Sequence, residues 1–290
     1  MGQFFSLLTA LIWAAAVVLL KRSGESVSPF ALNLFRVVVS TALLLPTLLL
    51  AGQLRWPQGT WRDVLVLFAS GIIAIATSDT LFHMSLNRVG AGISAVTDCL
   101  YAPLTVLFAA LILGERLAPR QLFGMALIIA GVLCAARHAP PRGVSPAQLY
   151  AGVAWGVLAM VFLALGIVIA KPVLNRAPVL WATAMRQIGC LCVMLPAALL
   201  SPRRREFLAV FRPSRAWRFS LPAAFLGSYL ALMFWIAGMK YTEVGVAAIL
   251  NQSSTILVLI LAAVFLKEPF TRRKLMACSL ALAGIVLVTL

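Results

Sequence analysis

The chain has 290 residues, of which 62% are hydrophobic and only 11% are charged. A water-soluble domain of this size could not keep so much apolar surface from aggregating, so the composition excludes one and indicates a polytopic membrane protein. The formal net charge of +16 does not indicate nucleic-acid binding, because the basic residues lie between apolar runs rather than on one amphipathic face.

Ten apolar stretches divide the chain, each close to the roughly 20 residues that a helix needs to cross a hydrocarbon core of about 30 Å. They are continuous runs rich in Leu, Ala and Val, which favours helices over the alternating strands of a barrel. The predicted fold is therefore all-α and polytopic, with ten transmembrane helices. In chain order the predicted spans are 4–20, 30–51, 64–84, 92–113, 121–136, 149–170, 178–200, 219–239, 245–266 and 274–290.

The flanks of these spans predict how the chain is oriented. Lys21 and Arg22 follow the first apolar run instead of preceding it, so this run is interpreted as span 1 and not as a removable signal peptide. Lys and Arg are most frequent in the loops away from the termini, above all in the Arg-rich stretch 203–218. The positive-inside rule then places both termini outside the cytoplasm and this stretch against anionic membrane lipids.

The second half of the chain repeats the first at a spacing of about 150 residues. The matching pairs are Lys21 and Lys171, Arg36 and Arg186, Pro46 and Pro196, Trp61 and Trp217, Gly71 and Gly227, Gly90 and Gly245, Glu115 and Glu268, and Gly131 and Gly284. Because each copy holds an odd number of spans, the second copy enters the membrane from the opposite side, as in many secondary transporters. The chain therefore divides into two inverted five-helix repeats, 1–138 and 139–290. Such a fused repeat is compatible with a monomer.

Each half ends its fourth span in an acidic signature and carries a glycine in its fifth span. The motifs are Leu113-Gly114-Glu115-Arg116 with Ile128-Ile129-Ala130-Gly131-Val132, and Leu266-Lys267-Glu268-Pro269 with Leu282-Ala283-Gly284-Ile285. Over essentially the whole chain this pattern resembles the EamA type of the drug/metabolite transporter superfamily. The second half departs from it, because Ile256 stands where the first half has Pro103 and Lys267 replaces a glycine. The two glutamates are interpreted as interfacial ion-pair partners of neighbouring basic residues.

The resemblance implies a multi-pass protein of the cell membrane, in a bacterium the inner membrane, that exports amino acids or related metabolites. It also implies a central cavity lined by spans including 3, 4, 8 and 9. Polar residues deep in apolar spans are costly, so those found in these spans are the candidate substrate-binding residues. They are Asp79, His83, Asp98, Tyr101, Tyr229, Trp235, Asn251 and Gln252.

These candidates have different expected roles. Asp79 and Asp98 could bind a substrate amine or carry a proton, and Asp79 could equally pair with a helix terminus or with His83. His83 lies one helical turn after Asp79 and either senses pH or is a hydrogen-bonded bystander. The repeat aligns Asp98 with Asn251, so two otherwise symmetric halves would hold an asymmetric ligand. Tyr229 and Trp235 offer stacking surfaces or belong to an interfacial belt.

Arg36 and Arg186 lie about two turns inside their spans, which is deep for contact with lipid. We expect both side chains to face protein or water. Each is either a structural anchor or part of the transport path, where it would pair with a substrate carboxylate.

The predicted function is a secondary transporter of small polar or amphiphilic metabolites, working by alternating access around a cavity between the repeats. No nucleotide-binding loop occurs, so the substrate gradient or protons would drive it. The alternative is a lipid-moving or scaffold membrane protein. An intramembrane aspartyl protease is disfavoured by the contexts Ser78-Asp79-Thr80 and Thr97-Asp98-Cys99. Five cysteines without Cys-x-x-Cys spacing and only two histidines give no support for a metal or other cofactor.

Overall fold

In the computed structural model, the described residues are 1–53, 60–114, 119–136, 145–241, 244–268 and 271–289. Within these ranges the chain is all-helical and contains no strand, as the sequence predicts. The helices up to residue 136 are α1 (Gly2–Ser23), α2 (Pro29–Leu50), α3 (Trp61–Gly71), the π-helix η1 (Ile72–Thr77), α4 (Ser78–Asp98), α5 (Tyr101–Leu113) and α6 (Pro119–Ala136). Those that follow are α7 (Pro146–Leu174), α8 (Val179–Leu200), α9 (Arg204–Ala209), α10 (Trp217–Ala223), the π-helix η2 (Ala224–Leu230), α11 (Ala231–Tyr241), α12 (Val244–Phe265) and α13 (Arg272–Thr289).

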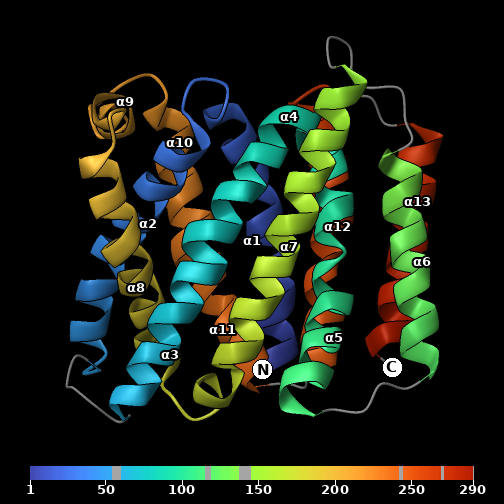
Figure 1. The fold of residues 1–290 in the computed structure, drawn as a ribbon, viewed down its shortest axis with the longest axis horizontal. Helices are drawn as coiled ribbons and strands as arrows, with labels where there is room; N and C mark the ends of the chain where they lie inside the picture. The colour runs from blue at the N-terminus through green and yellow to red at the C-terminus, as the bar shows by residue number, and fades with distance from the viewer. Residues whose placement is uncertain (54–59, 115–118, 137–144, 242–243, 269–270, 290) are drawn as a thin grey trace.

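The long helices stand side by side between two ends of the molecule, and the N-terminus lies at the same end as the end of α13 (Figure 1). In the described part of the chain, six helical stretches are long and apolar enough to cross a membrane. They are Gly2–Ser23, Pro29–Leu50, Trp61–Asp98, Pro146–Leu174, Val179–Leu200 and Trp217–Tyr241. Predicted spans 4, 9 and 10 fall on shorter apolar stretches, Tyr101–Leu113, Leu250–Phe265 and Leu275–Gly284. The count of ten spans therefore stays a prediction.

Local signals in the sequence explain where several helices begin and end. Pro29 opens α2 directly after Ser28, because proline is preorganised for the first helical turn. A capping box of Thr60 with Asp63 opens α3, and one of Ser145 with Gln148 opens α7. Gly114 ends α5 with a φ of 73°, in the left-handed region that glycine adopts without steric cost.

The boundary between predicted spans 3 and 4 differs from the one that the structure shows. Span 3 was expected to end at residue 84, but the helix continues to a kink at Gly90, where φ is 81°, and resumes up to Asp98. A short turn at 99–100 then precedes α5. Predicted span 4 thus corresponds to two short helical pieces, 91–98 and 101–113, and not to one continuous helix.

Small residues allow the close packing that positions the site. α7 packs along α4, and a Cβ atom added to Gly152 would lie 2.3 Å from Val89 Cγ1. A Cβ atom on Gly156 would lie 2.6 Å from Thr97 Oγ1. Helices in membranes approach each other in this way because small residues maximise van der Waals contact. α6 and α13 form a separate closely packed pair at one side of the bundle (Figure 1).

Candidate functional site

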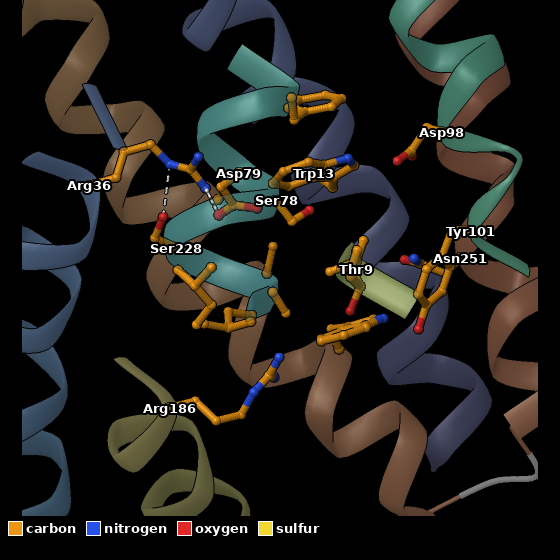
Figure 2. Close-up of a pocket in the computed structure, with 18 of the residues that line it drawn as sticks. Thr9, Trp13, Arg36, Ser78, Asp79, Asp98, Tyr101, Arg186, Ser228 and Asn251 are labelled. Atoms are coloured by element: carbon orange, nitrogen blue, oxygen red, sulfur yellow. Dashed lines mark hydrogen bonds and ion pairs between the residues drawn. The ribbon is translucent and has the colours of Figure 1, made fainter. Parts of the chain in front are cut away.

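A cavity lies in the middle of the bundle between helices from both halves of the chain. Its volume is about 870 Å³ with its open side included. Eight of the ten residues singled out from the sequence line it: Arg36, Asp79, Asp98, Tyr101, Arg186, Trp235, Asn251 and Gln252. Figure 2 shows Asp98, Tyr101 and Asn251 on one wall, with Arg186 on the opposite wall. Residues that are far apart in the sequence therefore meet around one space.

The other two candidates lie outside this cavity. The Tyr229 hydroxyl forms a hydrogen bond of 2.7 Å with Thr47 Oγ1, so it faces α2. His83 is buried one layer behind the cavity wall, where its Nε2 lies 2.5 Å from Arg36 Nη1. Because a guanidinium only donates hydrogen bonds, this contact requires a neutral His83 whose proton is on Nδ1.

Several cavity residues were missed by the sequence reasoning. Thr9 and Trp13 come from α1 and lie one turn apart, a spacing that puts both on one helical face. Gln187 follows Arg186 directly, and its Nε2 donates to Ser40 Oγ at 2.7 Å and to the Ser228 carbonyl at 2.8 Å. These polar groups satisfy one another, and no sequence signal separates them from ordinary packing residues.

The third helical stretch of each half becomes a π-helix where it reaches the cavity. η1 contributes Ala74 and Ile75 to the wall, and η2 contributes Gly227 and Ser228. π-Helical turns are uncommon and occur frequently at functional sites. In the second half, Ser228 of η2 accepts a hydrogen bond from Arg36 of the first half. In the first half, Ser70, just before η1, accepts one from Arg186 of the second half.

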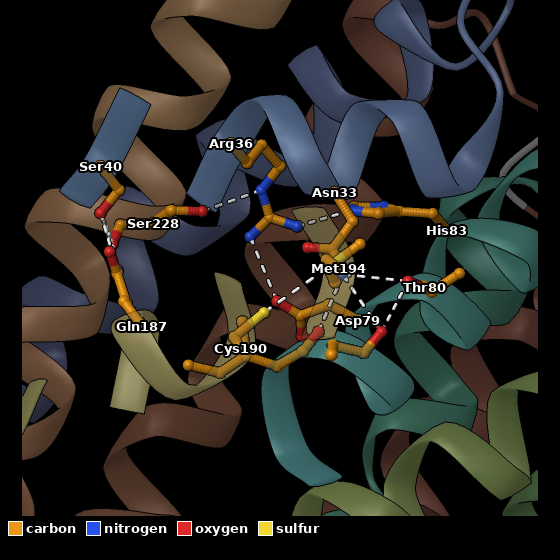
Figure 3. Close-up of polar contacts among 12 residues, drawn as sticks. Asn33, Arg36, Ser40, Asp79, Thr80, His83, Gln187, Cys190, Met194 and Ser228 are labelled. Atoms are coloured by element: carbon orange, nitrogen blue, oxygen red, sulfur yellow. Dashed lines mark hydrogen bonds and ion pairs between the residues drawn. The ribbon is translucent and has the colours of Figure 1, made fainter. Parts of the chain in front are cut away.

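Arg36 is fully engaged by neighbouring side chains. Its Nε donates to Ser228 Oγ at 2.9 Å, its Nη1 donates to His83, and its Nη2 lies 3.6 Å from Asp79 Oδ2 (Figure 3). The Arg36 side chain is 2% exposed, and Asp79 is 22% exposed toward the cavity. Each of the three guanidinium nitrogens of Arg36 thus has a partner side chain.

Arg186, the repeat counterpart of Arg36, has no such partners. Its Nε donates to Ser70 Oγ at 3.0 Å, and its guanidinium lies 5.6 Å from the centre of the Trp235 ring. Nη1 and Nη2 are buried without a hydrogen-bond partner among the described residues. At the offset of 156 that relates Gly71 to Gly227, Trp235 occupies the position that Asp79 has in the first half. The second arginine thus has an aromatic ring where the first has a carboxylate.

The opposite wall carries an acid that is also unpaired. The Asp98 side chain forms no hydrogen bond or ion pair with any residue that the structure describes. Gln252 Nε2 donates to the backbone carbonyl of Asp98, at 3.4 Å, and not to its side chain. Beside it, Tyr101 Oη and Asn251 Oδ1 are buried without a partner in the described part of the chain. The cavity therefore has an unpaired guanidinium on one wall and an unpaired carboxyl group on the other.

Comparisons with known proteins agree over the whole chain. The model of the EamA-like transporter family matches residues 1–137 and again 150–290. An uncharacterized transporter of Archaeoglobus fulgidus is 24% identical over 98% of this chain and 96% of its own length. A protein of Pseudomonas aeruginosa is 34% identical over 46% of this chain and 44% of its own length.

A solved crystal structure shares the fold, with a TM-score of 0.71 and 20% identity over 99% of this chain and 95% of that one. The family model covers both halves, and the long apolar helices are those of a multi-pass membrane protein. The chain belongs to the EamA-like transporter family.

Proposed function

We propose that this protein is a secondary transporter that exports small zwitterionic metabolites such as amino acids across a bacterial inner membrane. The observation that carries the proposal is that Arg186 and Asp98 face one cavity from opposite walls, each with free polar atoms that no described residue satisfies. A guanidinium with two free nitrogens suits a carboxylate. The Asp98 carboxylate, with Tyr101 and Asn251 beside it, suits an ammonium group.

The remaining cavity wall suits the side chain of such a substrate. Trp13, Phe82, Leu163 and Trp235 present apolar and aromatic surface to the space between the two charges. Ligand sites commonly combine such surface with a small number of polar groups that fix orientation. An amphiphilic zwitterion would satisfy the charges at its polar end and bury its side chain against these rings.

The proposed mechanism is alternating access between two inverted five-helix repeats, with ten transmembrane helices in all. Both halves line the cavity, and the equivalent Arg36 and Arg186 each bond to a serine of the opposite half. A rocking motion of one half against the other would change which membrane face reaches the cavity. A single chain supplies both halves, so we propose a monomer, driven by the substrate gradient or by protons.

Counterflow into liposomes containing the purified protein tests this proposal. The substrates are matched sets: a free amino acid, its carboxamide and its N-acetyl derivative. Uptake of the free amino acid alone is expected, because each derivative leaves one of the two cavity charges unpaired. Equal uptake of all three, or none above protein-free liposomes, would contradict the proposal. Movement of labelled phospholipid without solute counterflow would favour a lipid-moving protein instead.

A further inference from the structure

The kink in α4 divides this helix into two pieces with separate ends. Gly90 has a φ of 81°, which ends the first piece at Val89, and the second piece runs from Ala91 to Asp98. Asp98, the proposed amine ligand, is thus the last residue of a piece only two turns long. The orientation of this piece determines where the Asp98 carboxylate points.

Charged side chains from other elements bind both helix ends at the kink. The Glu268 carboxylate accepts hydrogen bonds from the backbone N–H groups of Ala91, at 2.7 Å, and Gly92, at 3.0 Å. Lys21 Nζ donates to the backbone carbonyl of Asn87 at 3.2 Å. An anion at a helix N-terminus and a cation at a C-terminus match the helix dipole and satisfy backbone groups that the kink leaves free.

The acidic signature predicts an ion pair for Glu268, and the structure also places its carboxylate on backbone amides of α4. Two features of the kink require a glycine at position 90. A side chain at residue 90 would be strained at positive φ, and a Cβ atom there would lie 2.7 Å from Glu268 Oε1. We call the contacts of Lys21, Gly90 and Glu268 the Gly90 clasp.

The Gly90 clasp ties together three helices that line the cavity. α1 reaches it through Lys21 and through Arg22, whose Nη2 donates to the Phe265 carbonyl at 3.0 Å. α12 reaches it through Phe265 at its end and through Glu268 just after it, and α4 reaches it through its kink. These helices carry Trp13, Asn251 and Asp98 of the cavity wall. The three walls are thereby held together at one end of the bundle.

The repeat assigns matching residues to the opposite end of the bundle. Lys171 corresponds to Lys21, Gly245 to Gly90 and Glu115 to Glu268, and Glu115 lies outside the described residues. Lys171 Nζ forms no hydrogen bond or ion pair within the described part of the chain. Lys21 is engaged at its own end, whereas Glu115 and Thr242, which match its neighbours Glu268 and Asn87, lie outside the described residues.

We propose that the Gly90 clasp is a gate, closed in this conformation, that opens when Glu268 leaves the amides of Ala91 and Gly92. Because the helix is already broken at Gly90, the piece 91–98 can swing without losing further helical hydrogen bonds across the kink. Opening moves Asp98 relative to Arg186 and couples access to substrate binding. The inference rests on the alternating access of the proposed function.

Hydrogen exchange measured by mass spectrometry on the full-length protein in lipid nanodiscs tests the gate without any substrate. The variant is Glu268→Gln, whose amide nitrogen cannot accept a hydrogen bond. Amides of residues 91–98 are expected to exchange about tenfold faster or more, because a charge-assisted contact is lost. If opening one end closes the other, peptides covering residues 168–177 at the opposite end exchange more slowly.

Two further variants separate a gate from a simple helix cap. Lys21→Gln weakens the clasp from the other side and should change both regions in the same directions. Glu206→Gln is the matched control, since Glu206 bonds to Arg203 in α9 and lies away from the clasp, so neither region should change. Faster exchange at 91–98 with unchanged exchange at 168–177 would show a cap only and overturn the proposal. If the liposomes show no counterflow but the variants change hydrogen exchange at both 91–98 and 168–177 as expected, the proposed transport function is overturned and the gate stands.

Discussion

Replacing Arg36 and Arg186 in turn by methionine should have opposite consequences, although the two residues are equivalent in the repeat. Methionine keeps the length and apolar character of the arginine stem and removes only the guanidinium. The comparison therefore isolates what each charge does in its surroundings.

Arg36→Met should mainly lower the stability of the folded protein. Removing one partner of a buried ion pair costs about 3–5 kcal/mol, since the other charge stays buried and unpaired. Asp79 is 22% exposed toward the cavity, where water partly solvates it, so we expect a value near 3 kcal/mol for Arg36→Met. The Ser228 hydroxyl and His83 Nε2 also lose their partner.

Arg186→Met should mainly weaken substrate binding. Arg186→Met removes one neutral-partner hydrogen bond, to Ser70, which is worth about 1 kcal/mol. It also removes a buried charge whose terminal nitrogens have no partner among the described residues, so the net change in stability should stay within about 1 kcal/mol. A substrate carboxylate would lose contacts worth about 1.5–3 kcal/mol, which weakens binding about 10-fold to 100-fold.

Thermal unfolding followed by tryptophan fluorescence and substrate affinity from counterflow, both in the same lipid, measure the two effects. Arg36→Met combined with Asp79→Leu should recover most of the lost stability, because neither charge is then left alone. The reasoning is refuted if both single variants lose equal stability. It is also refuted if Arg186→Met binds the zwitterionic substrate as tightly as the unaltered protein.

Three further outcomes follow from the same contacts. Trp235→Asp should give Arg186 the acid that Arg36 has and weaken substrate binding about tenfold or more, whereas Trp235→Leu, which leaves Arg186 uncompensated, should weaken it less. Gly71→Ala should lower stability by about 3 kcal/mol or more in thermal unfolding, because its Cβ would lie 1.8 Å from the Arg186 carbonyl oxygen. The matched Gly227→Ala, with Ala16 Cβ at 3.1 Å, should cost much less. Hydrogen bonds from Arg203 lower the pKa of Glu206 in α9. The stabilisation from this exposed pair is therefore fully present above the usual pKa of a glutamate, and it is lost as the pH falls through the lowered pKa. An NMR titration with an unshifted Glu206 carboxyl would contradict this assignment.

The sequence predicted the helices well because hydrophobic length is a strong local signal. The regular apolar runs indicated all of the long helices, and α1, α2 and α8 begin and end within three residues of the predicted spans. The junction of spans 3 and 4 could not be predicted in the same way. The sequence identifies Gly90 as the repeat counterpart of Gly245, but the contacts that Lys21 and Glu268 make at the kink come from positions distant in the chain.

The candidate site was accessible to sequence reasoning only in part. Burial cost singles out Asp79, Asp98 and the two arginines, because a charge inside an apolar run is expensive. Which charges neutralise each other is a question of three-dimensional distance. Arg36 and Arg186 have similar sequence surroundings, yet one is paired and the other is not. His83 was identified through its spacing from Asp79, and that spacing does not reveal that it turns toward Arg36.

The unequal surroundings of the two arginines imply that natural selection acts differently on the two halves of the repeat. One copy of the motif keeps its acid, so it holds the bundle together, and natural selection on it would act through protein abundance. The other copy has Trp235 in place of that acid, and selection there would act through which molecule is carried. Among relatives with different cargo, substitutions should therefore accumulate around Arg186 and be rare around Arg36.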